Sequence, residues 1–160
     1  MCILSDKDIL ERMNTGDLEI NGYHDRSLTP NGYDLRISEI SVRGKDAVRE
    51  GTVQIPPETM FYVSTTERIK MPRDLCAQLW LRTTWIRKGV IGAFGKIDAG
   101  FEGTLTLGAY NASEDAIELP IGERFCQMVF ETLHSSAAKG YGERSGNYQG
   151  QEGVTLRPKG

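Results

Sequence analysis

Short runs of alternating apolar and polar residues fill most of this 160-residue chain. In residues 33–38, Tyr33, Leu35 and Ile37 alternate with polar side chains, which is the pattern of a strand with one buried face. Glycine, proline and asparagine separate nine further runs, at residues 53–56, 60–65, 67–72, 76–82, 89–98, 104–111, 116–120, 124–133 and 153–158. Ten short strands at this spacing predict an all-β fold, either a β-sandwich or a jelly-roll-like barrel.

Two segments carry helix signals instead. Ser5 is followed by acidic residues and a one-sided apolar stripe that stops near Gly16, which predicts an N-terminal helix. Residues 83–89 predict a short helix, because a threonine can cap its start and Gly89 can end it. The tail from Gly140 is glycine-rich and polar, so it is either disordered or folded over another part of the molecule.

Composition limits the classes of function. Hydrophobic residues make up 39% of the chain and charged residues 26%, which is typical of a globular protein, and we expect one domain spanning residues 1–160. The formal net charge is −3 and the cations are dispersed among acids, which argues against nucleic acid or an anionic membrane as a partner. No apolar run approaches the roughly 18 residues of a membrane helix, and the N-terminal residues lack the apolar region of a secretory signal.

The cysteines and histidines argue against zinc chemistry. Cys2, Cys76 and Cys126 show no CxxC spacing, and the last two lie in apolar runs, as buried thiols of a reducing compartment do. With only His24 and His134, the chain lacks the ligand pattern of a zinc nucleobase deaminase. We therefore expect a cytoplasmic protein without a zinc site.

Four polar stretches stand where a sandwich does not require them. Asp34 and Arg36 form either an edge-strand pair facing water or part of a site. Residues 82–87 combine threonine hydroxyls with arginines, as a solvated helix cap or a phosphate cradle would. Asp98 is either a turn-former or an acid that positions water. The other candidates are Phe101, which is either a core aromatic or a site residue, the amide of Gln127, and Arg144, Tyr148 and Gln151 of the tail.

The residues of these stretches, and their order along the chain, resemble the motifs of one superfamily. From ILSDKDI through NGYDLRIS, RTTWIRKG, KIDAGFEGTLTLGAYN and IGERFCQMVF to NYQGQEGVTL, the chain is similar to the dUTPases and dCTP deaminases over nearly its whole length. The resemblance is closest to the dUTPases of the dCTP-deaminase-like, archaeal type. It implies a distorted jelly roll, a homotrimer with nucleotide sites shared between subunits, and a C-terminal segment, about residues 140–160, that closes over the ligand.

The resemblance also assigns the phosphate side of a site. Five residues match family positions that grip phosphates: Arg82, Thr83, Thr84, Arg87 and Gln127. Both threonines replace serines of the family motif, which keeps the hydroxyl groups and adds bulk. Asp34 matches the aspartate that helps to hold, through water, the Mg²⁺ bound to the triphosphate.

The same resemblance assigns the sugar and base side. Asp98 matches the acid that contacts the sugar 3′-hydroxyl or positions water, and Phe101 matches the aromatic that stacks on deoxyribose. Lys96 stands where deaminases often carry arginine, and backbone groups of a hairpin at residues 91–98 are implied to select uracil. Two residues of the closing tail complete the expected substrate contacts, Tyr148 and Gln151.

Gly108 departs from the deaminase pattern. The deaminases carry at this strand position a glutamate that shuttles protons when water attacks the cytosine ring, and glycine can transfer no proton. Glu102 is more than about 10 Å away if the strand stays extended, so we do not expect it to substitute. We therefore predict Mg²⁺-dependent hydrolysis of dUTP to dUMP and pyrophosphate, with water held by Asp98. The alternatives are a dCTP deaminase, monofunctional or bifunctional, and a non-catalytic nucleotide-binding homologue.

Overall fold

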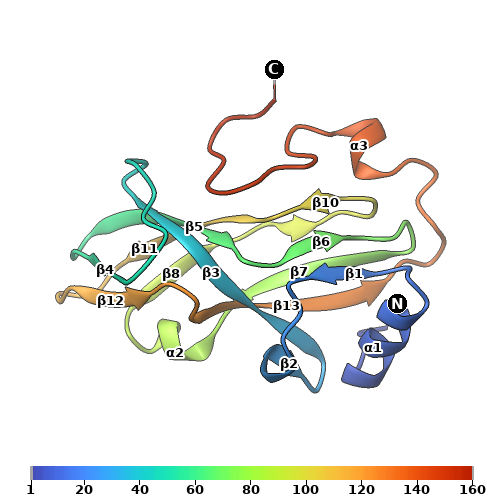
Figure 1. Ribbon diagram of the computed structural model, residues 1–160, viewed down its shortest axis with the longest axis horizontal. Helices are drawn as coiled ribbons and strands as arrows, with labels where there is room; N and C mark the ends of the chain where they lie inside the picture. The colour runs from blue at the N-terminus through green and yellow to red at the C-terminus, as the bar shows by residue number, and fades with distance from the viewer. Residues whose placement is uncertain (1, 160) are drawn as a thin grey trace.

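The chain folds into curved antiparallel sheets flanked by short helices (Figure 1). The computed structural model describes residues 2–159. The helices are α1 (Asp6–Asn14), α2 (Thr83–Ile86) and α3 (Tyr141–Arg144), with a 3-10 turn η1 (Asp25–Ser27). The strands are β1 (Glu19–Asn21), β2 (Leu28–Thr29), β3 (Gly32–Val42), β4 (Thr52–Ile55), β5 (Thr59–Thr65), β6 (Arg68–Lys70), β7 (Leu75–Leu81), β8 (Val90–Ala93), β9 (Lys96–Ile97), β10 (Glu102–Gly103), β11 (Thr106–Asn111), β12 (Ile117–Pro120) and β13 (Arg124–Thr132).

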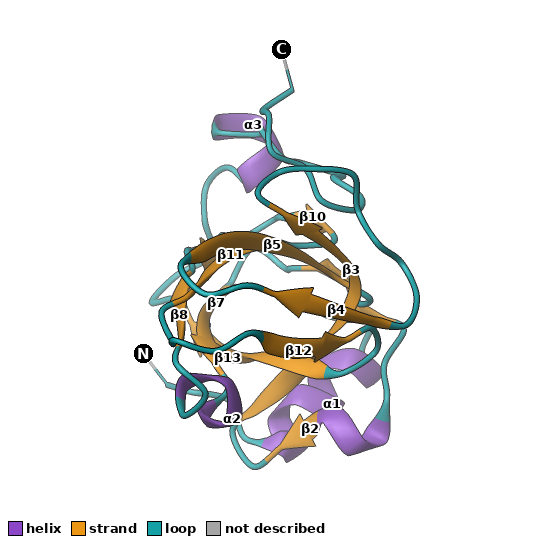
Figure 2. Cartoon of the chain, turned by 90° about the vertical axis from the view of Figure 1, so that its left-hand side faces the viewer, coloured by secondary structure: helices purple, strands orange, loops and turns teal. Residues whose placement is uncertain are grey.

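One long sheet supplies the framework. Its strands follow the order β8-β11-β5-β3-β13-β7-β9, with β2 added beside β3, and it curves strongly in Figure 2. Two small sheets, β1-β6-β10 and β12-β4, complete the arrangement. The predicted all-β fold, a distorted jelly-roll sandwich with one N-terminal helix and a short helix, is confirmed.

The segment at residues 91–98 differs from the expected hairpin. β8 pairs with β11, whereas β9 pairs with β7, at the other end of the long sheet. Since β8 and β9 are consecutive in the chain, the two residues between them join opposite edges of the curved sheet. The expected hairpin is therefore wrong, because β8 and β9 do not pair with each other but connect the two edges of the sheet. Closure of a sheet depends on all of its strands, and a local sequence pattern does not encode it.

Most predicted strands are present. Nine of the ten runs contain strands, and the exception is residues 153–158, which lie in the irregular tail. That run was wrong because Gly153 adopts a φ of +64°, which breaks an extended strand. The sequence pattern did not predict β1, β2 and β10, because two or three residues are too few to show alternation.

Both predicted helices are present. Ser5 caps α1 with its hydroxyl, and Asp8 bonds back to the Ser5 backbone, which completes a capping box. The cap of α2 differs from the expectation, because Arg82 occupies the cap position and makes no side-chain cap bond. The buried indole of Trp85 anchors this helix by donating from Nε1 to the carbonyl of Arg124 at 2.9 Å.

Alternation along β5 and β11 separates the core from a second face. Odd-numbered residues such as Val63 and Leu107 point into the core, which continues through Phe61 and Phe125. Even-numbered residues of the same strands point away from the core, as the two-residue period of a strand requires. This second face is only partly exposed, because another segment of the chain covers it.

The covering segment is the tail, defined here as residues 140–159. Figures 1 and 2 both show the tail and α3 on one side of the sheets and α1 and α2 on the other. Residues 149–151 of the tail bond to residues 102–104 through backbone and amide groups. The tail therefore folds over the outer face of β5 and β11, the second of the two expected states.

Two further expectations concern the cysteines, which were expected to be buried, and the lack of a membrane helix. Cys126 is buried, which raises the pKa of its thiol to about 12, while Cys76 is only half-buried. Within residues 2–159, no helix has the length and apolar character needed to cross a bilayer.

Candidate active site

A cavity of about 420 Å³ lies between the outer face of β5 and β11 and the tail. Residues from the connection after β8, from the turn after β9 and from the tail also line it. The predicted site residues on its wall are Lys96, Asp98, Phe101, Tyr148 and Gln151, and Gly108 lies there too. The sugar and base side of the predicted site is therefore gathered in one place.

Asp98 is the only carboxylate on the wall of this cavity among the residues that the structure describes. It directly follows β9, and its backbone carbonyl accepts a hydrogen bond from Phe101 at 3.1 Å, so the turn-former role and a site role coexist. Lys96 Nζ lies 3.2 Å from Asp98 Oδ1, and both side chains are largely exposed. The Asp98 carboxylate and the Lys96 ammonium therefore lie side by side on the cavity wall.

Phe101 is both a core residue and a wall of the cavity. It is buried, and Tyr141 of the tail packs edge-to-face on its ring with centroids 5.5 Å apart. The Tyr141 hydroxyl accepts a hydrogen bond from the backbone N–H of Tyr148 at 3.2 Å, which ties the tail to this aromatic pair. Gln151 is committed to the fold, because its amide donates to the carbonyl of Thr104 at 2.8 Å.

Gly108 faces the cavity from β11. In register it stands opposite Tyr62 of β5, and Met60 lies two residues along β5 from Tyr62, on the same face of the sheet. A Cβ placed on Gly108 would lie 3.0 Å from Met60 Cε and 3.7 Å from the Tyr62 ring. Met60 and Tyr62 therefore border the space that a side chain at position 108 would enter, and the Met60 methyl would have to shift by a few tenths of an ångström.

Glu102 does not reach this place. Its strand, β10, pairs with β6 in a different sheet, and its carboxylate pairs with Arg68 at 3.1 Å. It is absent from the residues that line the cavity within the described part of the chain. As expected, Glu102 does not place its carboxylate at the cavity wall beside Gly108.

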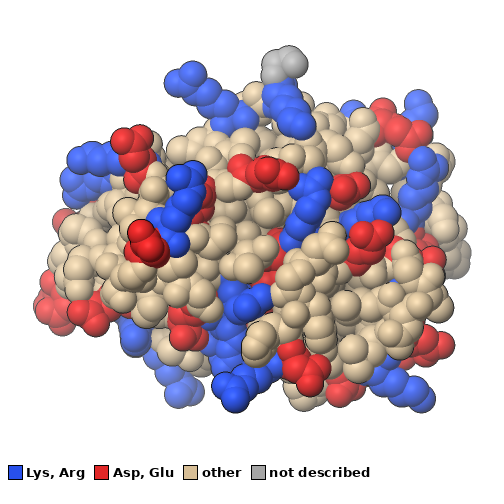
Figure 3. Space-filling view, in the orientation of Figure 1, with Lys and Arg blue, Asp and Glu red and all other residues tan. Residues whose placement is uncertain are grey.

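A second cavity, of about 550 Å³, gathers the phosphate side of the predicted site. It lies where β3, β7, β13 and the start of α2 meet. Its predicted residues are Asp34, Arg82, Thr83, Thr84 and Gln127, and Arg124 also lines it. Figure 3 shows Lys and Arg side chains gathered between α2 and β2 on this side of the molecule. Arg87 is exposed and belongs to neither cavity.

Asp34 is the buried anion of this second cavity. Arg82 Nε lies 2.9 Å and Arg124 Nη1 3.4 Å from its Oδ2 atom, and its side chain is only 4% exposed. Burial raises the pKa of the Asp34 carboxyl above its ordinary value, although Arg82 and Arg124 act in the opposite direction. Its Oδ1 atom is buried without a hydrogen-bond partner in the described part of the chain, so this oxygen is free to accept one.

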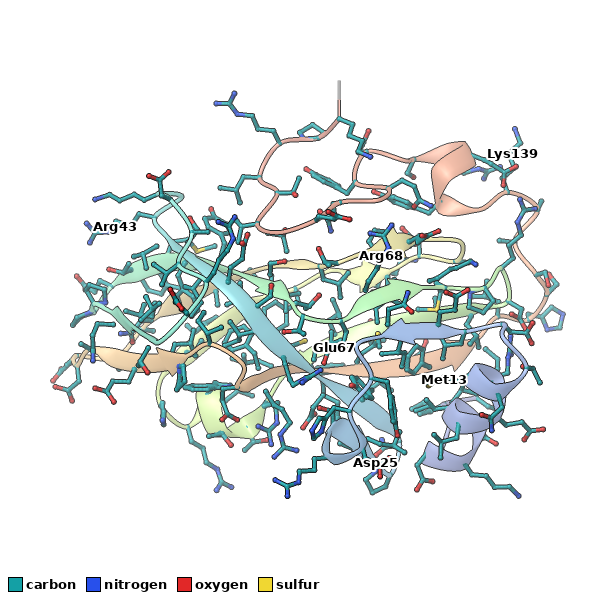
Figure 4. The ribbon with its side chains drawn as sticks, viewed as in Figure 1. Met13, Asp25, Arg43, Glu67, Arg68 and Lys139 are labelled. Atoms are coloured by element: carbon teal, nitrogen blue, oxygen red, sulfur yellow. The ribbon has the colours of Figure 1, made fainter. Side chains whose placement is uncertain are left out.

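The alternative of an edge-strand Asp–Arg pair facing water is wrong. β3 pairs with β5 on one edge and with β13 on the other, so it is an inner strand and not an edge strand. Arg36 pairs instead with the fully buried Glu67, which Figure 4 labels, at 2.7 Å. Sequence reasoning also missed Arg124, which lies 90 residues from Asp34 and becomes its neighbour only through the pairing of β13 with β3.

Gln127 contributes to the same wall. Its amide donates to Thr29 Oγ1 at 3.1 Å, so it is fixed beside the cavity by a strand that the sequence pattern did not reveal. The side chains of Thr83 and Thr84 are exposed at the start of α2. Both residues line the cavity and are exposed, so a ligand in the cavity can reach them.

The two cavities are separated along β7. Lys96 pairs with Gln78, and Arg82 follows four residues later, which corresponds to roughly 13 Å of extended strand. Between them lies a third hollow with exposed apolar side chains: Trp80 at 62%, Ile86 at 53% and Ile91 at 60%. One chain alone therefore presents the two halves of the predicted site as separate surfaces.

Comparisons with known proteins agree with this architecture. Residues 42–133 match the family model described as dCTP deaminase-like. The dCTP deaminase of Thermococcus kodakarensis is 43% identical over 88% of this chain and 90% of its own length. A probable deoxyuridine 5′-triphosphate nucleotidohydrolase of Sulfolobus islandicus rod-shaped virus 1 is 36% identical over 96% of this chain and 97% of its own.

A solved structure shares the fold. The 2′-deoxycytidine 5′-triphosphate deaminase of Agrobacterium tumefaciens superposes with a TM-score of 0.71 and 20% identity, over 83% of this chain. The present chain spans about half of that protein, 48%. The family match, the sequence relatives and the shared fold lead to one conclusion: the chain belongs to the dCTP deaminase-like family of the dUTPase and dCTP deaminase superfamily.

Proposed function

We propose that the protein is a dUTP diphosphatase, which hydrolyses dUTP to dUMP and pyrophosphate. One observation carries the proposal: the cavity that bears Asp98 has no second carboxylate among its described wall residues, and Gly108 is packed by Met60 and Tyr62. Removal of an amine from cytosine needs a group that moves protons at the ring, whereas hydrolysis of a phosphoanhydride needs an oriented water. The cavity supplies a group for the second reaction.

In the proposed reaction, Asp98 accepts a hydrogen bond from a water molecule and directs it at the α-phosphorus. The water oxygen forms a bond to phosphorus, and the bond from phosphorus to the oxygen that bridges the α- and β-phosphates breaks. Asp98 takes the proton of the water and returns it to solvent, and pyrophosphate leaves. Positioning and electrostatic stabilisation supply most of the rate, because the chain needs to form no covalent intermediate.

Asp34 fits the expected role toward Mg²⁺. The described residues contain no cluster of three or more metal-ligating side chains, so the ion would be carried chiefly by the triphosphate. The unpartnered Oδ1 of Asp34 can accept a hydrogen bond from water on such an ion, while Arg82 and Arg124 hold Oδ2. When bound, Mg²⁺ neutralises negative charge on the triphosphate.

We infer that the active unit is a homotrimer in which the phosphate cavity of one subunit meets the base cavity of the next. The separation of the two cavities supports this arrangement, and so does the apolar surface at Trp80, Ile86 and Ile91 between them. Lone exposed apolar residues are common, but a group of large ones beside a cavity is typical of an interface. The free cysteines support a cytoplasmic location.

A dCTP deaminase is the second candidate, because the Thermococcus relative carries that name. It would require Asp98, or a group from another subunit, to serve as the proton carrier at the cytosine ring. A nucleotide-binding homologue without activity is the third candidate, and the presence of both Asp34 and Asp98 argues against it.

Separate incubations with dUTP and dCTP in the presence of Mg²⁺ test these candidates. Chromatography of the products distinguishes dUMP from dUTP, and an ammonia assay detects deamination. We expect dUMP and pyrophosphate from dUTP, no ammonia from dCTP, and loss of turnover in Asp98→Asn. Ammonia release from dCTP above the rate of an enzyme-free control would overturn the proposal, and dUTP binding without turnover would favour the third candidate.

A further inference from the structure

Glu39 is a buried acid that the proposed reaction does not use. It lies on β3, its side chain is 7% exposed, and it is absent from the residues that line either cavity. Its Oε2 atom pairs with Arg49 Nε at 2.7 Å, although the Arg49 side chain is 76% exposed. A carboxylate this deeply buried requires partners for both of its oxygens.

The second partner comes from the tail. The backbone N–H of Val154 donates a hydrogen bond to Glu39 Oε1, across 115 residues of sequence. Hydrogen bonds to an ionised acceptor are stronger than those between neutral groups, particularly where water is excluded. Glu39, which lies on β3, thus binds a backbone N–H group of the tail.

The tail is shaped to meet this acid. Gly153 has a φ of +64°, and a Cβ at this position would lie 2.6 Å from Glu39 Oε1. The Thr106 hydroxyl donates to the carbonyl of Gly153 at 3.2 Å and accepts from the N–H of Thr155 at 2.9 Å. The turn at residues 153–155 is therefore held by two strands of the long sheet, by Glu39 of β3 and by Thr106 of β11, with β5 between them.

This turn lies directly beside the cavity. Gln151 precedes the turn, Thr155 belongs to it and Leu156 follows it, and all three line the cavity that bears Asp98. Leu156 also reaches the loop after β3, where a Cβ on Gly44 would lie 3.4 Å from its Cδ1 atom. Figure 4 labels Arg43, which directly follows β3 at the start of that loop. The position of the cavity roof thus depends on the turn that Glu39 holds.

Other ionic contacts of the tail are weaker anchors. Arg68, labelled in Figure 4 below the tail, approaches Glu152 at 3.4 Å, but the Glu152 side chain is 80% exposed. Exposed ion pairs of this kind contribute little to stability, because water screens them. Glu39 is the buried acid that contacts the tail in the described part of the chain.

We propose that Glu39 is a positioning residue that fixes the tail turn at residues 153–155 as the roof of the cavity. Its effect on turnover rests on the proposed dUTP hydrolysis, whereas its hold on the tail does not. Glutamine at position 39 retains an oxygen that can accept the Val154 N–H, while alanine removes it. Glu39→Gln should therefore preserve the turn, and Glu39→Ala should release it.

Hydrogen exchange tests the hold on the tail without any substrate. In Glu39→Ala we expect the amides of residues 153–155 to exchange about 10-fold faster or more, with β7 and β13 unchanged. Glu39→Gln should stay close to wild type. Glu118→Ala is the matched control, because Glu118 is an exposed acid that accepts one side-chain hydrogen bond, from Gln54, on a strand away from the tail. Wild-type exchange at residues 153–155 in a folded Glu39→Ala variant would refute the proposal.

Kinetics with dUTP tests the effect on the cavity. We expect Glu39→Ala to raise KM for dUTP about 10-fold, and Glu39→Gln to restore a value close to wild type. Equal KM values for Glu39→Ala and wild type would refute the positioning role. If the wild type does not hydrolyse dUTP, the proposed function fails, and the exchange measurement alone decides the role of Glu39. Should Glu39→Ala not fold, Gly153→Ala replaces it, because its methyl group would displace the same turn, and unchanged exchange in that variant would also refute the proposal.

Discussion

Met60 and Gly108 pack against each other across two neighbouring strands, with Met60 Cε 3.0 Å from the place of a Cβ on residue 108. The pair lies on the face of β5 and β11 that the tail covers. Gly108 stands at the position where the family resemblance implies a glutamate in the deaminases, and the terminal methyl of Met60 borders the space that a side chain there would enter. The effect of a substitution at either residue on stability should therefore depend on the side chain at the other.

The first prediction follows from this pair. Gly108→Glu should lower the free energy of unfolding by about 1 kcal/mol, because the terminal methyl of Met60 must shift to make room for the new side chain. Combining it with Met60→Ala should recover part of this loss, so the two changes should be non-additive by more than about 0.5 kcal/mol. Urea unfolding of the wild type, both single variants and the double variant measures the coupling. Additive effects would show that Met60 does not occupy the space in question.

The second prediction concerns Asp98. Asp98→Asn retains the shape of the side chain but cannot take a proton from water, so kcat for dUTP should fall about 10²-fold to 10⁴-fold. KM should change much less, since the amide still forms hydrogen bonds. Steady-state kinetics with dUTP provides the measurement, and Glu118→Ala serves as the control. A kcat within threefold of wild type would remove Asp98 from the mechanism.

The third prediction concerns pH and Asp34. Burial raises the pKa of this carboxyl in the folded protein above its value in the unfolded chain. The folded state then binds the proton more tightly, so the contribution of Asp34 to stability is complete below the unfolded pKa and is lost as the pH rises through the folded pKa. Asparagine does not titrate. The free energy of unfolding of Asp34→Asn, relative to wild type, should therefore increase as the pH is raised from about 3 to about 7.

Urea unfolding at several pH values measures this effect, and activity with dUTP should fall in the same variant. A relative stability that decreases with rising pH would mean that Arg82 and Arg124 outweigh burial. Such a result would also show that the carboxylate stabilises the fold in its ionised form. The expected outcome is instead that the carboxylate of Asp34 lowers the stability of the fold near neutral pH, while serving the proposed role toward phosphate and Mg²⁺.

The fourth prediction concerns assembly. Trp80→Glu places a charge in the apolar hollow between the two cavities, so it should dissociate the proposed trimer and abolish dUTP turnover. Light scattering after size-exclusion chromatography measures the mass. Val48→Glu is the control, because Val48 is also exposed, at 43%, but does not line that hollow. A wild-type protein that elutes with the mass of one chain would contradict the shared site.

The sequence by itself determined the local features of this protein. Alternating residues define strands such as β5 and β11 and show which side chains share a face, because a strand repeats every two residues. Ser5 and Asp8 determine the start of α1, because a helix cap needs only neighbouring residues. The sequence also identified the candidate residues Asp34 and Asp98 and the lack of an acid at position 108. These features depend only on which residue stands at each position.

Only the tertiary structure decided which distant residues meet. The contacts of Asp34 with Arg124 and of Glu39 with Val154 join positions 90 and 115 residues apart. The pairing that makes β3 an inner strand and the closure that separates β8 from β9 likewise depend on the whole sheet. A local pattern specifies which face of a strand is buried, whereas its partners depend on packing throughout the chain. For this reason most candidate residues could be named from the sequence, but Arg124 and the division of the candidates between two cavities could not.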